Sequence, residues 1–302
     1  MKSTKLVCAG IAAILVAVAP VTPALAAFDT YLSIFGTDNN SCAISTPCQT
    51  MVRAMTETST GGVLHCLDSN DYFTGNTITV ITQSITIDCS NTTAAVGPFT
   101  INGSDIIVHF KGLTMPNVGP LIFQNGSELY VENCFIFGNA FGIQFSPTAA
   151  ANLFVVNSTI RNNSGAGVLI KPSAGGSVTA TFDRVTITNN AGGLKTDTTN
   201  GAVRVDISNS TISNNANNGL IAIGGAGGQN MVSVSSAVIA SNSQAGIEAS
   251  GANAAVLVNN TLLDSNAGGA GSAVSGGRIL TYQNNRTIGL PGTGFTGTAS
   301  PN

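Results

Sequence analysis

Apolar residues recur at fixed places through the chain and predict a series of equivalent strands. Six segments, aligned on one apolar position, follow one another at steps of 24, 27, 25, 27 and 24 residues. The positions five and seven residues before this anchor are apolar in every copy, whereas the position between them varies from Tyr130 to Asp206. A period of two is typical of a strand with one face in a core and one in solvent. The anchors are Ile136, Ile160, Ile187, Ile212, Ile239 and Leu263.

The length of the repeat predicts how these strands are connected. A period of 24 to 27 residues divides into three stretches, each long enough for a strand of roughly five residues and a turn. We therefore expect an all-β, single-domain right-handed parallel β-helix of about eight three-strand coils, ~4.8 Å apart. A leucine-rich repeat has a similar period, but the return segments here are rich in Gly, Ala, Ser, Thr and Asn rather than Leu.

Two further columns of the repeat predict how the coils turn. Three residues after each anchor stands an asparagine, and amides stacked at such a corner can hydrogen-bond from coil to coil. A glycine follows at the next corner, where we expect it to supply backbone angles that other residues avoid. The asparagines are Asn139, Asn163, Asn190, Asn215, Asn242 and Asn266, and the glycines are Gly142, Gly167, Gly193, Gly219 and Gly246.

The two ends of the chain depart from the repeat, as the ends of a solenoid must in order to cover open strand edges. The segment 47–58 predicts a short capping helix with Met51, Val52 and Met55 on its apolar face. We expect an N-terminal cap over residues 27–62, the parallel β-helix over 63–276, and a C-terminal cap and tail over 277–302.

The first residues have the pattern of an export signal. Lys2 and Lys5 precede an almost wholly apolar run over 7–19, and the tripeptide 24–26 matches a small-x-small cleavage site. The run is shorter than the ~18–20 residues of a membrane span. We therefore expect residues 1–26 to be a signal peptide and the mature protein to be bacterial and secreted, periplasmic or extracellular, with no membrane span.

Composition excludes several classes of function. Only 8% of the residues are charged and 43% are hydrophobic, which argues against a disordered chain. The chain has 11 basic and 14 acidic residues, a net charge of −3, and no basic stripe. We therefore expect no nucleic-acid partner, because binding to phosphates requires clustered positive charge.

Five cysteines follow the signal peptide, and pairing is the default in an oxidising compartment. Cys42 and Cys48 flank a tight loop. Cys66 and Cys89 are predicted to lie one coil apart, at a spacing that a disulfide tolerates. We expect these two bridges, with Cys134 left as a buried thiol. A metal site is the alternative, but the sequence lacks a Cys-x-x-Cys spacing and has only two histidines.

Several segments of the mature chain resemble a known family. They are Gly36-Thr37-Asp38-x-Asn40-x-Cys42, Pro47-Cys48-x-Thr50, the runs 61–68 and 84–89, and the Asn-Ser-Thr-Ile-x-x-Asn-Asn coils. The pattern is similar to that of secreted bacterial right-handed parallel β-helix proteins of the pectin-lyase-like superfamily. The resemblance covers essentially the mature chain and implies the fold. It also implies contact with acidic polysaccharides, on which the enzymes of this family mostly act, although the fold carries tailspikes and adhesins too.

The motifs expected of such enzymes are missing, and one weaker cluster takes their place. There is no Asp-Asp pair, and neither His65 nor His109 is flanked by glycines. Arg204 and Asp206 share the outer face of one predicted strand, with Asp183 diagonal to Asp206 at ~8 Å on the preceding coil. Two carboxylates at this separation could perform acid/base glycoside chemistry or hold Ca²⁺. A solvated polar face is the alternative, and no other cofactor or metal is expected.

Aromatic and basic residues supply candidates for binding glycan. Tyr130 and Phe154 are predicted to share an outward column on adjacent coils, and Phe137 is also predicted to point outward. Exposed rings can bind the faces of sugars, although a covering loop or a subunit contact would use them equally well. Lys171 and Lys195 follow glycine corners on consecutive coils and could meet an anionic glycan.

These observations favour an exported, non-catalytic surface or structural module that contacts polysaccharide. The alternative is a polysaccharide lyase or glycoside hydrolase that acts on an acidic glycan, and a third reading is a purely structural or adhesive rod. The feature that would separate them is an outer face that gathers two carboxylates with a base or a bound calcium ion.

Overall fold

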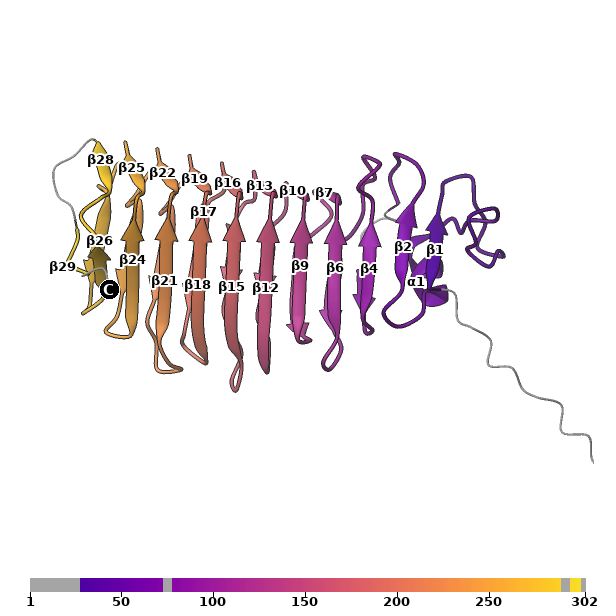
Figure 1. Cartoon of the computed structure of the whole chain (residues 1–302), viewed down its shortest axis with the longest axis horizontal. Coiled ribbons are helices and arrows are strands. Elements are labelled where there is room, and N and C mark those ends of the chain that lie inside the picture. The colour runs from indigo at the N-terminus through magenta and orange to yellow at the C-terminus, as the bar shows by residue number, and fades with distance from the viewer. Residues whose placement is uncertain (1–27, 73–77, 289–293, 300–302) are drawn as a thin grey trace, which may run out of the picture.

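The computed structural model describes residues 28–72, 78–288 and 294–299, which wind into a parallel β-helix (Figure 1). Successive coils lie side by side along one axis, with the N-terminal and C-terminal coils at opposite ends. The strands form three sheets of 12, 9 and 8 strands, which makes about 9 turns rather than the expected eight. The fold class is therefore the expected one.

The twelve-stranded sheet contains the longest strands and carries the surfaces discussed below. Its strands, in spatial order, are β1 Asp29–Leu32, β2 Val63–Cys66, β4 Ile85–Asp88, β6 Ile107–Lys111, β9 Glu128–Glu132, β12 Ala150–Val156, β15 Ser177–Asp183, β18 Ala202–Ser208, β21 Asn230–Ser235, β24 Ala254–Asn259, β27 Arg278–Thr281 and β29 Gly297–Thr298.

The other two sheets complete each turn. The eight-stranded sheet contains β7 Thr114–Pro116, β10 Phe135–Phe137, β13 Thr159–Arg161, β16 Thr186–Thr188, β19 Thr211–Ser213, β22 Val238–Ala240, β25 Leu262–Asp264 and β28 Arg286–Ile288. The nine-stranded sheet contains β3 Thr79–Ile81, β5 Phe99–Asn102, β8 Leu121–Asn125, β11 Ile143–Phe145, β14 Ala166–Ile170, β17 Gly192–Asp197, β20 Leu220–Ile223, β23 Ile247–Ser250 and β26 Gly271–Val274.

The pairing register confirms the sequence repeat. The six anchors from Ile136 to Leu263 pair with one another in order through the eight-stranded sheet, and each is at most 2% exposed. The residues five and seven positions before each anchor pair from coil to coil in the twelve-stranded sheet, and their side chains are buried on its inner face. Burying one such Val, Leu or Ile side chain contributes about 1.5–3 kcal/mol, so the inward columns dominate the stability of the coil.

The asparagine column forms a hydrogen-bonded ladder at the corner between the eight- and nine-stranded sheets. From Asn139 to Asn242, each backbone N–H donates to the side-chain Oδ1 of the ladder asparagine on the next coil, at 2.9–3.1 Å. All six asparagines are at most 5% exposed. Because buried polar groups are costly without partners, the ladder keeps the coils in one register.

The glycine column has a different physical basis from the one expected. None of its five members has a positive φ. A Cβ at Gly193 would instead lie 2.0 Å from the backbone oxygen of Gly219, and one at Gly142 would lie 2.4 Å from the side chain of Ile160. The glycines are required because the next coil packs directly against the backbone. Left-handed angles occur one residue before the ladder, at Gly138, Asn162, Asn189, Asn214, Ser241 and Ser265.

The N-terminal helix α1, Met51–Glu57, is shorter than the segment expected to contain it. Thr50 caps it by accepting a hydrogen bond from the backbone N–H of Arg53 at 3.2 Å. Its buried face consists of Met51, Ala54 and Met55, whereas Val52 is 51% exposed, so the expectation for Val52 was wrong.

Both expected disulfides are present. Cys42 pairs with Cys48, and Cys66 pairs with Cys89 across adjacent coils at a Cα–Cα distance of 4.8 Å. Cys134 is a free, buried thiol. The second bridge fastens the first coils of the solenoid, where fewer neighbouring coils support each strand.

Strand pairing extends past both ends of the region expected to form the solenoid. β1, which lies within residues 27–62, pairs with β2, and beyond residue 276 the strands β27, β28 and β29 pair with their neighbours. The division into caps, solenoid and tail stays a prediction. Residues 1–26, the expected signal peptide, lie outside the described residues. No helix in the described ranges is both long and apolar enough to cross a membrane.

Candidate functional site

The acidic cluster expected on β15 and β18 has the predicted spacing, but neighbouring side chains hold one of its carboxylates. Asp183 pairs in register with Ser208, two positions from the level of Asp206, so the two carboxylates are diagonal as expected. Asp183, however, accepts hydrogen bonds from Ser208 Oγ at 2.9 Å and Asn209 Nδ2 at 2.8 Å, and it forms an ion pair with Arg184. These hydrogen bonds lower the pKa of Asp183, which is therefore ionised and already engaged by its neighbours.

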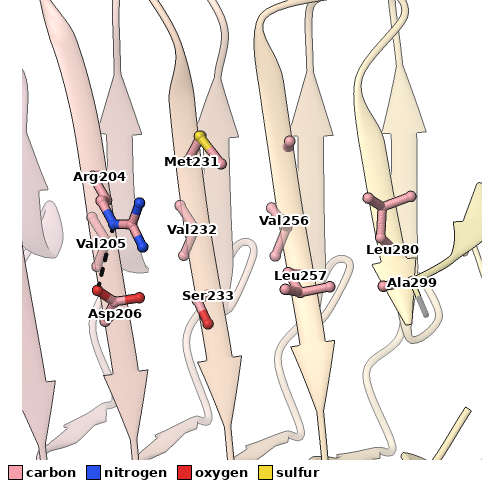
Figure 2. A pocket seen from close by; sticks show the side chains of 11 residues that line it. Arg204, Val205, Asp206, Met231, Val232, Ser233, Val256, Leu257, Leu280 and Ala299 are labelled. Atoms are coloured by element: carbon pink, nitrogen blue, oxygen red, sulfur yellow. Dashed lines mark ion pairs between the residues drawn. The ribbon is translucent and has the colours of Figure 1, made fainter. Parts of the chain in front are cut away.

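The remaining members of that cluster border a groove instead. Arg204 and Asp206 form an exposed ion pair at 3.8 Å. Beyond them a groove of about 250 Å³ follows the outer face of β18 to β27, with Met231, Leu257 and Leu280 along it (Figure 2). The lining is mainly apolar. Across the described part of the chain, no three His, Cys, Asp or Glu side chains gather in a way that could hold a metal ion.

The aromatic candidates divide between two sheets. Tyr130 and Phe154 stack on the outer face of the twelve-stranded sheet, with ring centroids 4.6 Å apart and planes inclined by 16°. His109, on the preceding coil, stacks on the other side of Tyr130 at 4.1 Å and 3°. Phe137 lies outward on the eight-stranded sheet, where Arg161 sits 5.9 Å from the centre of its ring. The structure therefore adds His109 to the aromatic column and leaves Phe137 apart from it.

Polar groups surround this column. The Tyr130 hydroxyl donates to Glu128 at 2.7 Å, and Asn152 Nδ2 lies 3.4 Å from the other oxygen of the same carboxylate. A parallel column places Lys111 between Asp88 on one coil and Glu132 on the next. We call this region the aromatic surface; it consists of His109, Lys111, Glu128, Tyr130, Glu132, Asn152 and Phe154.

The aromatic surface shifts the protonation of its own residues. Burial lowers the pKa of His109 and outweighs the carboxylates of Glu132 and Glu128, which raise it, so the imidazole is neutral at neutral pH. The hydrogen bond to Glu128 raises the pKa of Tyr130, with burial as a second cause, so the phenol stays protonated. A neutral imidazole and a phenol therefore stand side by side on adjacent strands.

Charge on the aromatic surface is predominantly negative. Asp88, Glu128 and Glu132 place three carboxylates on or beside it, against the single ammonium of Lys111. Each uncompensated charge repels an incoming anion by about 0.7 kcal/mol at roughly 6 Å in water. The surface therefore favours a neutral ligand over an acidic one.

Sequence reasoning missed five residues of the aromatic surface, namely His109, Lys111, Glu128, Glu132 and Asn152. The period of two could have located two of them. When the strand alignment is extended to the preceding coil, His109 aligns with Tyr130 and Lys111 aligns with Glu132. The repeat phrase that anchors the alignment is absent from that coil, since the residues there read Gly112-Leu113-Thr114-Met115-Pro116.

Comparison with known proteins identifies the architecture. A family model described as "Right handed beta helix region" matches residues 62–206. Among solved structures, the pectate lyase Pel9A superposes with a TM-score of 0.68 at 16% identity, covering 90% of this chain and 78% of that chain. A rhamnogalacturonan lyase gives 0.41 at 13% identity, covering 90% and 86%. A comparison with curated protein sequences finds no match. At 16% identity, the likeness to the pectate lyase concerns the fold alone.

Proposed function

Because the chain is a right-handed parallel β-helix protein of the pectin-lyase-like fold, we propose that it is an exported, non-catalytic protein that binds polysaccharide through the aromatic surface. The single observation that carries this proposal is the stacked column of His109, Tyr130 and Phe154 flanked by carboxylate, amide and ammonium groups. The two disulfides support export, since such bridges persist in oxidising compartments.

The stacking decides how a sugar would bind. Because the three rings cover one another, Tyr130 offers its edge and hydroxyl rather than a free face. The far face of Phe154 is directed toward β15, where the paired residue is the smaller Thr181. We place a pyranose ring against that face, with Asn152, on the same strand as Phe154, in position to bind its hydroxyl groups. The excess of carboxylates makes a neutral sugar the preferred ligand.

Affinity electrophoresis of the purified chain 27–302 against neutral and acidic polysaccharides tests the proposal. We expect retardation by at least one neutral polysaccharide, with loss of retardation in Phe154→Ala. Phe137→Ala is the matched control, because it removes a half-buried outward ring from a different sheet. Equal retardation of both variants and the parent protein would contradict the proposal.

An acid/base enzyme is the second candidate, favoured by one observation: the neutral His109 and the protonated Tyr130 are neighbours. In a lyase, the imidazole would take a proton from the sugar ring and the phenol would protonate the leaving oxygen. Incubation with uronate-containing polysaccharides, followed by ultraviolet detection of unsaturated ends, tests it. Ends that form with the parent protein but not with His109→Ala or Tyr130→Phe would replace the binding proposal, and calcium is included because a lyase could require it.

A further inference from the structure

A second groove, of about 350 Å³, lies where the chain enters the nine-stranded sheet, on a different face from the aromatic surface. Two consecutive coils have only small residues at this place: Gly165 and Ala166 on one, Ala191 and Gly192 on the next. The coils on either side have larger residues, so the groove is a depression about two coils, or about 10 Å, wide.

One wall of the groove is aromatic and the opposite wall consists of amides. The ring of Phe141 lies against Gly165, where an added Cβ would stand 2.9 Å from it. The other wall contains Asn217, Asn218 and Gln244, and Gln244 Nε2 donates to Asn217 Oδ1 at 3.3 Å. This bond leaves the amide N–H groups of Asn217 and the oxygen of Gln244 for a ligand. An apolar wall facing amide donors and acceptors matches a pyranose, which has an apolar face and a rim of hydroxyl groups.

Lys195 gives the groove a positive charge. The other lysine predicted at this corner, Lys171, is engaged by the buried carboxylate of Asp197 at 3.0 Å. Lys195 lines the groove and has no ion pair in the described part of the chain. Within the described strands, its outward column contains one carboxylate, Glu248, which stands two coils away at about 9.6 Å and accepts a hydrogen bond from Asn218 at 2.9 Å.

We propose that this groove binds a single anionic pyranose, with the acidic group of the sugar at Lys195, the ring against Phe141 and the hydroxyl groups at the Asn217–Gln244 pair. The class includes hexuronic acids and sulfated hexoses. The groove has room for one ring rather than a chain, so affinity should be on the order of 1 mM, as the small number of ligand atoms allows. The proposal is independent of the aromatic surface and does not require it to bind sugar.

Gly192 supplies a clean way to close the groove. An added Cβ there meets its nearest neighbour, the Cβ of Ala166, at 3.9 Å, which is ordinary contact. The residue does not have a positive φ. Gly192→Leu therefore directs a larger side chain into the groove from a position where the Cβ meets no clash. Thr186→Leu is the matched control, since it adds the same side chain to an outward position of the eight-stranded sheet on the same coil.

The experiment is a titration of the methyl-labelled protein, disulfides intact, followed by NMR. The probes are glucuronate, galacturonate, glucose 6-sulfate and glucose. We expect either hexuronate to shift the methyl signals of Ala166, Ala191 and Ile221, which line the groove. Lys195→Gln should weaken this binding about tenfold, because it removes a charge-assisted hydrogen bond. Gly192→Leu should abolish the shifts, and Thr186→Leu should leave them unchanged.

Three outcomes would overturn the proposal: no shift of these methyl signals with any anionic sugar, shifts that persist in Gly192→Leu, or glucose binding as tightly as the hexuronates. Binding of glucose 6-sulfate alone would support an anionic sugar and identify a sulfate as its charged group. Phe154→Ala should not change the titration, because Phe154 lies on a different face. The two proposals can therefore fail independently: this titration tests the groove, and affinity electrophoresis tests the aromatic surface.

Discussion

Replacement of Asn190 by alanine tests how the coils are held together. Its side-chain oxygen accepts from the backbone N–H and the amide of Asn163, at 3.0 and 2.8 Å. Its amide donates to the carbonyl oxygen of Ile160 and to Asn215 Oδ1, each at 3.2 Å. Alanine removes all four bonds and leaves no side-chain group in their place.

The loss of stability in Asn190→Ala follows from the hydrogen-bond donors that it leaves without an acceptor. The backbone N–H and the side-chain amide of Asn163, a residue 2% exposed, both lose their acceptor. A buried polar group without a partner costs about 1–3 kcal/mol, so two of them lower the free energy of unfolding by about 4 kcal/mol. At the end of the ladder, Asn139 accepts only from the backbone N–H of Gly119, at 2.8 Å. Asn139→Ala should therefore cost about half as much, roughly 2 kcal/mol.

Urea denaturation followed by far-ultraviolet circular dichroism measures both variants against the parent protein, with the disulfides intact. We expect the midpoint to fall for each, and to fall further for Asn190→Ala. Equal losses in the two variants, or a loss below about 1 kcal/mol for Asn190→Ala, would refute the assignment of stability to the orphaned donors.

Three further predictions concern other parts of the fold. Gly193→Ala should destabilise the protein because its Cβ would meet the oxygen of Gly219, whereas the neighbouring Gly192→Ala should be neutral; matched urea curves would show this, and equal curves would contradict it. Burial raises the pKa of Cys134 to about 12, so a thiol reagent at pH 8 should not modify it until urea unfolds the chain. For Asp197, burial opposes the charged form, but hydrogen bonds from Thr199 and the ion pair with Lys171 outweigh it and lower the pKa below the ordinary 3.8. Its contribution to stability is therefore full above about pH 4 and lost as the pH falls through the folded pKa, and Asp197→Asn should flatten this acid loss in melting curves.

The interior of the coil was predictable because it is repeated. Each inward position faces the equivalent position of the next coil, so the same requirement appears every 24 to 27 residues, and the anchors aligned without error. The reason for the glycines was not predictable in the same way. From the sequence, Gly193 is expected to supply unusual backbone angles. The distance of 2.0 Å from its added Cβ to the backbone oxygen of Gly219 on the next coil shows instead that a larger residue would not fit.

The outer face was harder to predict because it does not repeat. The position that holds Tyr130 holds His109 on the coil before and Thr181 two coils later, and no rule of periodicity connects these side chains. Asp183 and Asp206 have the predicted spacing. Asp183 nevertheless hydrogen-bonds with Ser208 and Asn209 and forms an ion pair with Arg184, and these contacts depend on side-chain positions that the sequence pattern does not specify.

The equivalence of the coils has a consequence for how such a chain changes its length. Removing residues 187–211 would join Thr186 to Ile212, which occupies the same column as Ile187. Every inward column would continue across the junction, and the rod would shorten by one turn, about 4.8 Å. Gain or loss of a whole turn is therefore a single genetic step that keeps the core intact while it moves the two ends of the rod closer together or further apart.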